Sequence, residues 1–127
     1  MKQIISTKKA PAAIGPYNQG TSFEKLVFLS GQIPLNPETM EIVEGGVKEQ
    51  TKQVMENLKA VLEEANSSYG NVLKTTCYLS DMDNFLAFNE VYAEYFGASD
   101  APARATVAVK TLPKNVLVEV DAIAFKN

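Results

Sequence analysis

Arginine occurs once in this 127-residue chain, and it lies in an apolar segment near the C-terminus. Eleven lysines supply the other basic side chains, whereas Arg104 stands within residues 101–107 (APARATV). A guanidinium presents paired N–H donors that match the two oxygens of a carboxylate, which a lysine ammonium does not. The pattern therefore favours Arg104 as a carboxylate-binding group, and the alternative is a structural ion pair with Asp121 or Glu119.

The second candidate is Glu119, which lies in a segment that is apolar on both faces of a strand, residues 116–123 (VLVEVDAI). A carboxylate there needs an ion-pair partner or a pocket in which it polarises water. If the last two strands form a hairpin in the simplest register, Thr106 lies opposite Glu119. Arg104 then lies opposite Asp121 and becomes a diagonal neighbour of Glu119, unless a bulge shifts the register.

Four further residues could line a cleft, and each also has a plainer structural explanation. Tyr17 follows Gly-Pro in a loop that could carry a phenol into a cleft or pack it away. Ser30 and Gly31 end a strand, where glycine allows a ligand to approach the backbone or forms a simple bulge. Asn89 lies at the edge of an apolar helical stripe, where its amide needs a hydrogen-bond partner. The one cysteine, Cys77, has no basic neighbour in sequence and is predicted to be an inert buried thiol.

The composition excludes several kinds of chemistry. The chain has no histidine, so it cannot form a Ser-His-Asp triad, a Cys-His pair or a histidine-ligated zinc site. One cysteine cannot form an internal disulfide, which suits a reducing compartment. The glycines form neither a dinucleotide-binding fingerprint nor a P-loop. The net charge of −3 and the lack of a basic cluster argue against nucleic-acid binding.

The periodicity predicts the elements that must position these residues. We expect strands near residues 2–7, 26–33, 71–80, 104–110 and 115–125, an amphipathic helix over 47–65, and a second helix that begins at an N-cap within 81–83 and ends at Gly97. Strand 26–33 is apolar on both faces, which is typical of a central strand. The order predicts an α+β fold with a mixed sheet and both helices on one face, because each helix shows one apolar stripe.

The opposite face of that sheet has no helix to cover it. Alternate strand positions such as Val107, Val109 and Val118 are apolar, so we expect burial against further copies of the chain. The first residues are too short an apolar run for a signal peptide, and nowhere do 18 apolar residues follow one another. The sequence predicts one domain, residues 1–127, in a soluble cytoplasmic protein with no membrane partner.

Seven segments in order resemble the RidA (YjgF) reactive-intermediate deaminase family over the whole chain. They are residues 10–17 (APAAIGPY), 30–34 (SGQIP), 57–63 (NLKAVLE), 88–92 (FNEVY), 102–104 (PAR), 112–114 (LPK) and 118–120 (VEV). The resemblance implies a chorismate-mutase-like fold, a homotrimer and ligand clefts between adjacent subunits. It also implies a hydrolytic deamination that needs no cofactor or metal. Reactive 2-imino acids and their enamine tautomers, such as 2-iminobutanoate and 2-iminopropanoate, would give 2-oxo acids and ammonia.

By position, the resemblance implies that Arg104 binds the substrate carboxylate and Glu119 activates water. It implies that Tyr17, Ser30, Gly31, Asn89 and Thr106 bind substrate. Thr106 stands where many members have cysteine, and because the family contact there involves the backbone, we expect binding to persist. The alternative function is a non-catalytic trimer that senses small 2-oxo carboxylates. A third, RNA cleavage, fits poorly with the isoelectric point of about 5.0.

Overall fold

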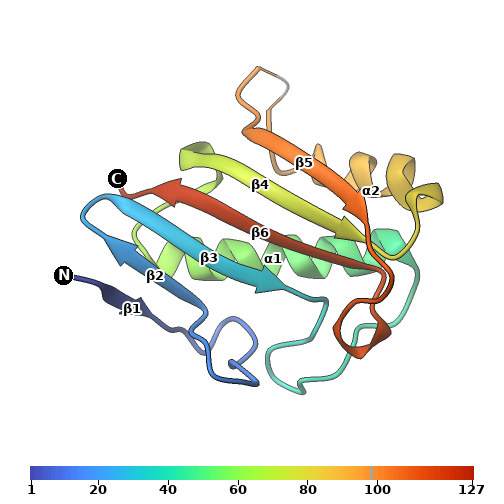
Figure 1. Cartoon of the computed structure of the whole chain (residues 1–127), viewed down its shortest axis with the longest axis horizontal. Coiled ribbons are helices and arrows are strands. Elements are labelled where there is room, and N and C mark those ends of the chain that lie inside the picture. Colours follow the sequence, from blue (N-terminus) through green and yellow to red (C-terminus); the bar gives the residue numbers. More distant parts are fainter. Residues whose placement is uncertain (98) are drawn as a thin grey trace.

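A computed structural model describes residues 1–97 and 99–127. Its strands and α-helices are β1 (Gln3–Ile5), β2 (Gly20–Phe23), β3 (Leu26–Gln32), α1 (Val47–Glu64), β4 (Val72–Leu79), α2 (Phe85–Tyr92), β5 (Ala103–Ala108) and β6 (Val118–Phe125). Three short 3-10 helices complete the elements: η1 (Tyr69–Asn71), η2 (Met82–Asn84) and η3 (Pro113–Asn115). The strands form one mixed sheet in the order β1-β2-β3-β6-β4-β5, and both α-helices lie behind it in Figure 1. The predicted α+β fold is confirmed.

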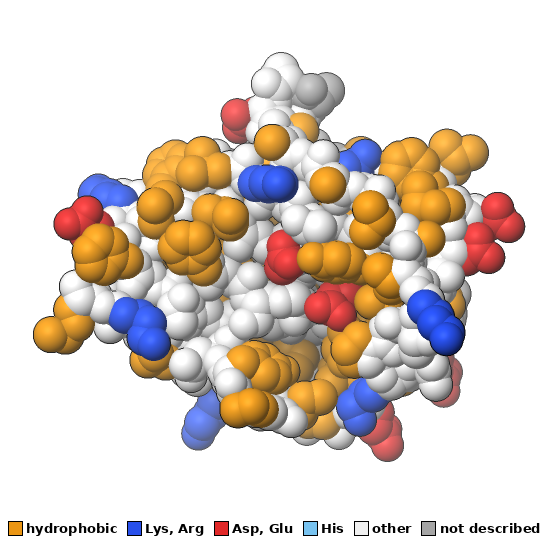
Figure 2. Space-filling model, viewed as in Figure 1, with side chains coloured by type: hydrophobic (Ala, Val, Ile, Leu, Met, Phe, Trp, Pro, Cys, Tyr) orange, Lys and Arg blue, Asp and Glu red, His pale blue; other side chains and the backbone are white. Residues whose placement is uncertain are grey.

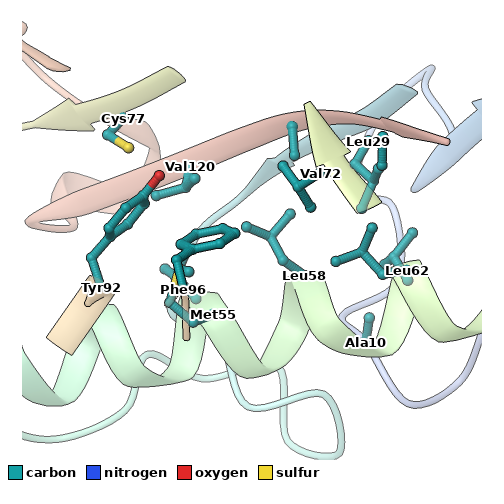
Figure 3. Close-up of a cluster of buried hydrophobic side chains, with 14 of the residues drawn as sticks. Ala10, Leu29, Met55, Leu58, Leu62, Val72, Cys77, Tyr92, Phe96 and Val120 are labelled. Atoms are coloured by element: carbon teal, nitrogen blue, oxygen red, sulfur yellow. The ribbon is translucent and has the colours of Figure 1, made fainter. Parts of the chain in front are cut away.

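Helix α1 follows its predicted range closely because its apolar positions recur at helical spacing. Met55, Leu58 and Leu62 are fully buried, and Figure 3 shows Leu58 and Leu62 directed toward Val72 and Leu29 of the sheet, with Met55 beside Phe96. At the start of the helix, the Glu49 carboxylate accepts a hydrogen bond of 2.7 Å from the Gly46 amide. Helix α1 therefore packs against the inner face of the sheet through these buried side chains.

The predicted cap within residues 81–83 begins the 3-10 helix η2, and helix α2 follows it at Phe85 and ends earlier than expected. The Asp81 carboxylate accepts from the Asp83 amide in the N-cap arrangement of η2. The α-helix ends at Tyr92, and Gly97 is not its stop. Beyond Tyr92 the backbone changes to shorter hydrogen bonds, from Glu94 to Val91 and from Tyr95 to Tyr92, which tighten the chain into turns.

The predicted hairpin between the last two strands is wrong, and one strand was missed. Strand β4 separates the two, since it pairs with β5 in parallel and with β6 antiparallel. The connection through η3 crosses the end of β4 instead of turning back beside β5. The register differs accordingly: Thr106 lies opposite Cys77, and Glu119 lies opposite Tyr78. The missed strand is β2, four residues that link β1 to β3 and thereby give β3 its predicted interior position.

The face of the sheet away from the helices carries exposed apolar side chains. Leu26, Phe28, Leu73, Val107 and Phe125 are each 38–48% exposed in the single chain. Figure 2 views this face and shows apolar side chains gathered over it, with acidic side chains near its centre. Within residues 1–97 and 99–127, no helix has the length and apolarity needed to cross a membrane.

Candidate functional site

A cleft of about 350 Å³ lies where the N-terminal loop, the end of β3 and the start of β6 meet. We call it the Glu119 cleft, and its walls are Ile14, Tyr17, Ser30, Gly31, Ile33, Pro113 and Glu119. The β3–β6 register shifts between Leu29 and Gln32, which confirms a bulge at Ser30 and Gly31. Four of the predicted site residues therefore come together: Tyr17, Ser30, Gly31 and Glu119.

The bulge lets the Glu119 side chain cross the backbone of β3. A Cβ placed on Gly31 would lie 2.0 Å from Glu119 Oε2 and 2.9 Å from its Cδ, so a side chain at position 31 excludes the present carboxylate position. Glycine is needed here for close approach and not for an unusual backbone angle. The structure therefore gives glycine at position 31 a second reason beside the bulge, which is room for the Glu119 carboxylate, and the approach of a ligand to this backbone stays a prediction.

The carboxyl of Glu119 is electrostatically unusual. Burial raises its pKa above the ordinary value, and the negative charge of Asp121, two residues along the same face of β6, raises it further. The Tyr78 hydroxyl on β4 donates to Asp121 Oδ2 at 3.3 Å. A carboxyl with a raised pKa takes up a proton more readily at neutral pH, which suits a group that accepts a proton and returns it.

The loop that forms the other wall of the cleft is held by a buried amide. Gln19 is 4% exposed; its Nε2 donates to the carbonyls of Thr7, Ala10 and Pro11, and its Oε1 accepts from the Thr7 amide. Ser30 Oγ donates to the Asn18 carbonyl at 2.6 Å, which fixes the loop to the end of β3. Sequence reasoning missed Gln19, because a loop glutamine has no signal until the loop is folded around it.

Arg104 lies in a second cleft of about 350 Å³, between α2 and residues 101–104. Its Nη1 donates to Asn89 Oδ1 at 2.8 Å. The guanidinium carbon also lies 5.5 Å from the ring centre of Phe85 and 4.8 Å from that of Tyr92, within cation–π range. Arg104 and Asn89, both predicted as site residues, thus come together, and the contacts of Arg104 with the two aromatic rings were not predicted.

The structural ion pair considered for Arg104 does not form. Across the described ranges, the one ion pair within 4.0 Å joins Lys48 to Glu90. Arg104 lies opposite the buried Thr75 and so points toward the helices, whereas Glu119 lies opposite Tyr78 on the other face. Its predicted position as a diagonal neighbour of Glu119 is therefore wrong, and the site residues divide between two clefts.

Thr106, which is predicted to bind substrate, and Cys77 line neither of the two clefts. They are opposite one another on β5 and β4, and the Thr106 hydroxyl oxygen is buried with no hydrogen-bond partner among the described residues. Cys77 is buried as predicted, and burial raises the pKa of its thiol to about 11, which favours an unreactive cysteine. In the same ranges no three Cys, Asp or Glu side chains gather as metal ligands.

The two clefts carry complementary chemical groups. The Arg104 cleft offers a cation with several unused N–H donors, and the Glu119 cleft offers a carboxyl beside a space large enough for a small molecule and water. Asp121, Ile33 and Pro113 were not predicted as parts of the site. Of these three, only Asp121 could have been predicted from the sequence, because residues two apart on a strand share a face and Asp121 is two residues from Glu119.

Comparisons with known proteins show the family to which the chain belongs. The Endoribonuclease L-PSP family model matches residues 7–126. A RutC family protein of Pyrococcus abyssi is 55% identical over 98% of each chain. The mouse 2-iminobutanoate/2-iminopropanoate deaminase is 45% identical over 99% of this chain and 93% of the mouse protein. The structure of E. coli TdcF with bound serine superposes with a TM-score of 0.92, 42% identity, and coverage of 98% of this chain and 99% of TdcF. The chain belongs to the RidA/YjgF/L-PSP (RutC) family.

Proposed function

We propose that this protein is a homotrimer that hydrolyses 2-imino acids to 2-oxo acids and ammonia in clefts between subunits. The observation that carries the proposal is the placement of Arg104 and Glu119 on opposite faces of one sheet. One chain cannot direct both at one small molecule, but two copies packed through the exposed sheet face can. The mouse relative, named for this activity, supports the choice of substrate.

The proposed chemistry needs only the groups already described. Arg104 binds the carboxylate of the protonated imino acid and fixes the position of its C=N carbon. Glu119 takes a proton from water as the water oxygen bonds to that carbon, which gives a carbinolamine. Glu119 then returns the proton to nitrogen, and the C–N bond breaks with its electron pair on nitrogen. The hydroxyl oxygen forms the C=O bond as its proton passes to Glu119 and on to the ammonia, so ammonium and the 2-oxo acid leave. The imine is electrophilic by itself, so no imidazole is required.

The apolar sheet face supports the trimeric assembly. Leu26, Phe28 and Val107 are 44–45% exposed in the single chain, and such a patch favours association. A closed ring of copies would bring the outer face of one sheet near the β5 edge of the next. Sedimentation equilibrium of the purified chain tests this assembly: a monomer at micromolar concentration would contradict it.

A trapping assay tests the activity. A threonine dehydratase generates 2-iminobutanoate, and semicarbazide captures the imine in competition with the added protein. We expect the wild-type chain to reduce semicarbazone formation and to increase 2-oxobutanoate, whereas Arg104→Ala does neither. No diversion of the imine at stoichiometric protein would contradict the enzymatic function.

A second function, non-catalytic binding of small carboxylates, is favoured by one observation. TdcF, at 42% identity, holds serine, which has a carboxylate but no imine. Binding needs Arg104 and not Glu119, so this function predicts that Glu119→Gln changes nothing measurable. For the same Glu119→Gln variant, the enzymatic function predicts that the affinity for 2-oxobutanoate is unchanged and that hydrolysis of the imino acid is about a hundred-fold slower.

We do not extend the ribonuclease name of the family model to this chain. Its net charge is −3, and phosphate binding requires clustered basic side chains. Titration of labelled RNA at low and high salt tests this view, and tight binding with a steep salt dependence would contradict it.

A further inference from the structure

The guanidinium of Arg104 is held by one face of α2. Phe85, Asn89 and Tyr92 are spaced four and three residues apart, so they share that face. Asn89 accepts a hydrogen bond from Arg104 Nη1, and the two rings lie within 5.5 Å of the guanidinium carbon. Arginine has five N–H donors, and this contact occupies one of them. The helix thus fixes the cation and leaves donors for a ligand.

The Tyr92 ring is itself fixed from the sheet. Its hydroxyl shares a buried hydrogen bond of 2.7 Å with Thr75 Oγ1, and the two residues are 6% and 1% exposed. Figure 3 shows the Tyr92 hydroxyl directed from α2 toward the strands. Thr75 is also the residue that β4 places directly opposite Arg104. The ring therefore bridges helix and sheet immediately beside the guanidinium.

The contacts that hold the Arg104 guanidinium in place affect how tightly a carboxylate can bind to it. An arginine side chain has several rotatable bonds, and ordering it when a carboxylate binds would weaken affinity. Because the Tyr92 ring, the Asn89 amide and strand β4 already hold the guanidinium, the entropy cost of ordering the Arg104 side chain is met when the protein folds. The ligand then binds without that cost. A ring that could tilt would allow the guanidinium to turn away from the cleft.

We propose that Thr75 and Tyr92, through the hydrogen bond between them, are positioning residues that orient Arg104 for the ligand carboxylate. The inference rests on the carboxylate-binding role that the proposed function gives to Arg104. Neither residue is a catalytic group in this scheme, because each acts on the ligand only through Arg104.

The single arginine makes a direct test possible. The Arg104 Nε–Hε pair gives the only such correlation in a proton–nitrogen NMR spectrum, and the two rings should move it upfield of free arginine. Tyr92→Phe keeps the ring and removes the hydroxyl, while Thr75→Val keeps the shape and removes the partner. We expect both variants to move the signal toward free arginine and to weaken 2-oxobutanoate binding about five-fold. The double variant should bind no more weakly than either single one.

Matched variants separate positioning from folding. Tyr95→Phe removes an exposed hydrogen bond of 2.8 Å to Glu56, and Thr51→Val removes a buried hydroxyl that donates to the Val47 carbonyl. We expect neither to move the Arg104 signal or the affinity, even if the melting temperature falls. Thr75→Ser retains a hydroxyl and should restore both readouts.

The outcomes are distinct. An unchanged Arg104 signal and unchanged affinity in Tyr92→Phe and Thr75→Val would overturn the inference. A wild-type chain that binds no 2-oxo acid would overturn the proposed function, and the Arg104 signal would still decide whether Thr75 and Tyr92 hold the guanidinium. If Tyr92→Phe fails to fold, the comparison of Thr75→Val with Thr75→Ser decides the question.

Discussion

Arg104 and Glu119 lie on opposite faces of one sheet, with strand β4 between the strands that carry them. Arg104 points toward α2, where Asn89 accepts from it, and Glu119 points into the cleft beside Gly31. The sheet separates the two side chains, so one chain does not direct both into one cleft. A reaction that needs both must therefore take one from each of two chains.

This relationship predicts that two inactive variants restore activity when they assemble together. Arg104→Ala and Glu119→Gln should each be nearly inactive as pure proteins. In a mixed assembly from equal amounts, about a quarter of the clefts receive an intact Arg104 from one chain and an intact Glu119 from its neighbour. The trapping assay on co-refolded variants measures the recovery. Activity that stays at the level of the separate variants would contradict a shared site.

Replacement of the single arginine by lysine should fail in spite of the retained charge. Lysine cannot bind a carboxylate through two parallel N–H donors, and it forms weaker contacts with the Phe85 and Tyr92 rings. We expect Arg104→Lys to weaken 2-oxobutanoate binding about ten- to hundred-fold with an unchanged oligomeric state. Calorimetry and sedimentation measure the two quantities, and near-normal affinity would show that charge alone suffices.

The elements that the sequence predicts well are those fixed by local periodicity. Helix α1 matches its expected range because its buried positions recur every three to four residues over 18 residues. Strand β2 was missed because four residues, one of them glycine, show too little alternation. The Asp81 cap was predicted because a side chain that accepts from the amide two residues later is a local feature.

The relationships that sequence reasoning could not give are non-local. The last two strands resemble a hairpin in sequence, and nothing near them shows that β4 lies between them. Residue types identified Arg104 and Glu119, but only the strand order places them on different faces. The contacts of Tyr92 with Arg104 and Thr75 were hidden for the same reason, since a tyrosine on an apolar stripe looks like core.

The close approach of Gly31 to Glu119 predicts a specific loss of turnover in Gly31→Ala. The added Cβ would lie 2.0 Å from Glu119 Oε2, so the carboxylate must leave its present position. We expect hydrolysis to fall about a hundred-fold, as it would without a positioned base. Gly70→Ala is the control, because the nearest atom to its new Cβ is Ser68 Oγ at 3.8 Å. Equal turnover in the two variants would refute this role for Gly31.

We expect that the Cys77 thiol neither reacts as a nucleophile nor takes part in redox chemistry in the folded protein. It is fully buried, and burial raises the pKa of its thiol to about 11, so about one molecule in ten thousand holds a thiolate at neutral pH. We expect no reaction with a disulfide reagent until the protein is unfolded, and full turnover in Cys77→Ala. Rapid labelling of the native protein would show that the thiol is reachable.

The charge of Asp121 should shift the acid limb of the pH profile to higher pH. Burial first, and Asp121 second, raise the pKa of Glu119. A base must be ionised to act, so turnover rises as pH passes upward through that pKa. Tyr78, which also faces this pair, keeps its proton because burial and then Asp121 raise the pKa of its phenol. Asp121→Asn should therefore move the acid limb to lower pH and leave the plateau unchanged; an unmoved limb would exclude Asp121 as the tuning group.

The same raised pKa predicts how Glu119 affects stability. Between its unfolded and folded pKa values the folded chain binds the carboxyl proton more tightly, so folding stability from this group falls as pH rises through that window. Glu119→Gln removes the group, and we expect this variant to lose less stability than the wild type between acidic and neutral pH. Urea unfolding of both proteins at equal concentration measures the difference. A larger loss in the variant would mean that the carboxylate is stabilised in the assembled protein by a cation from the neighbouring chain.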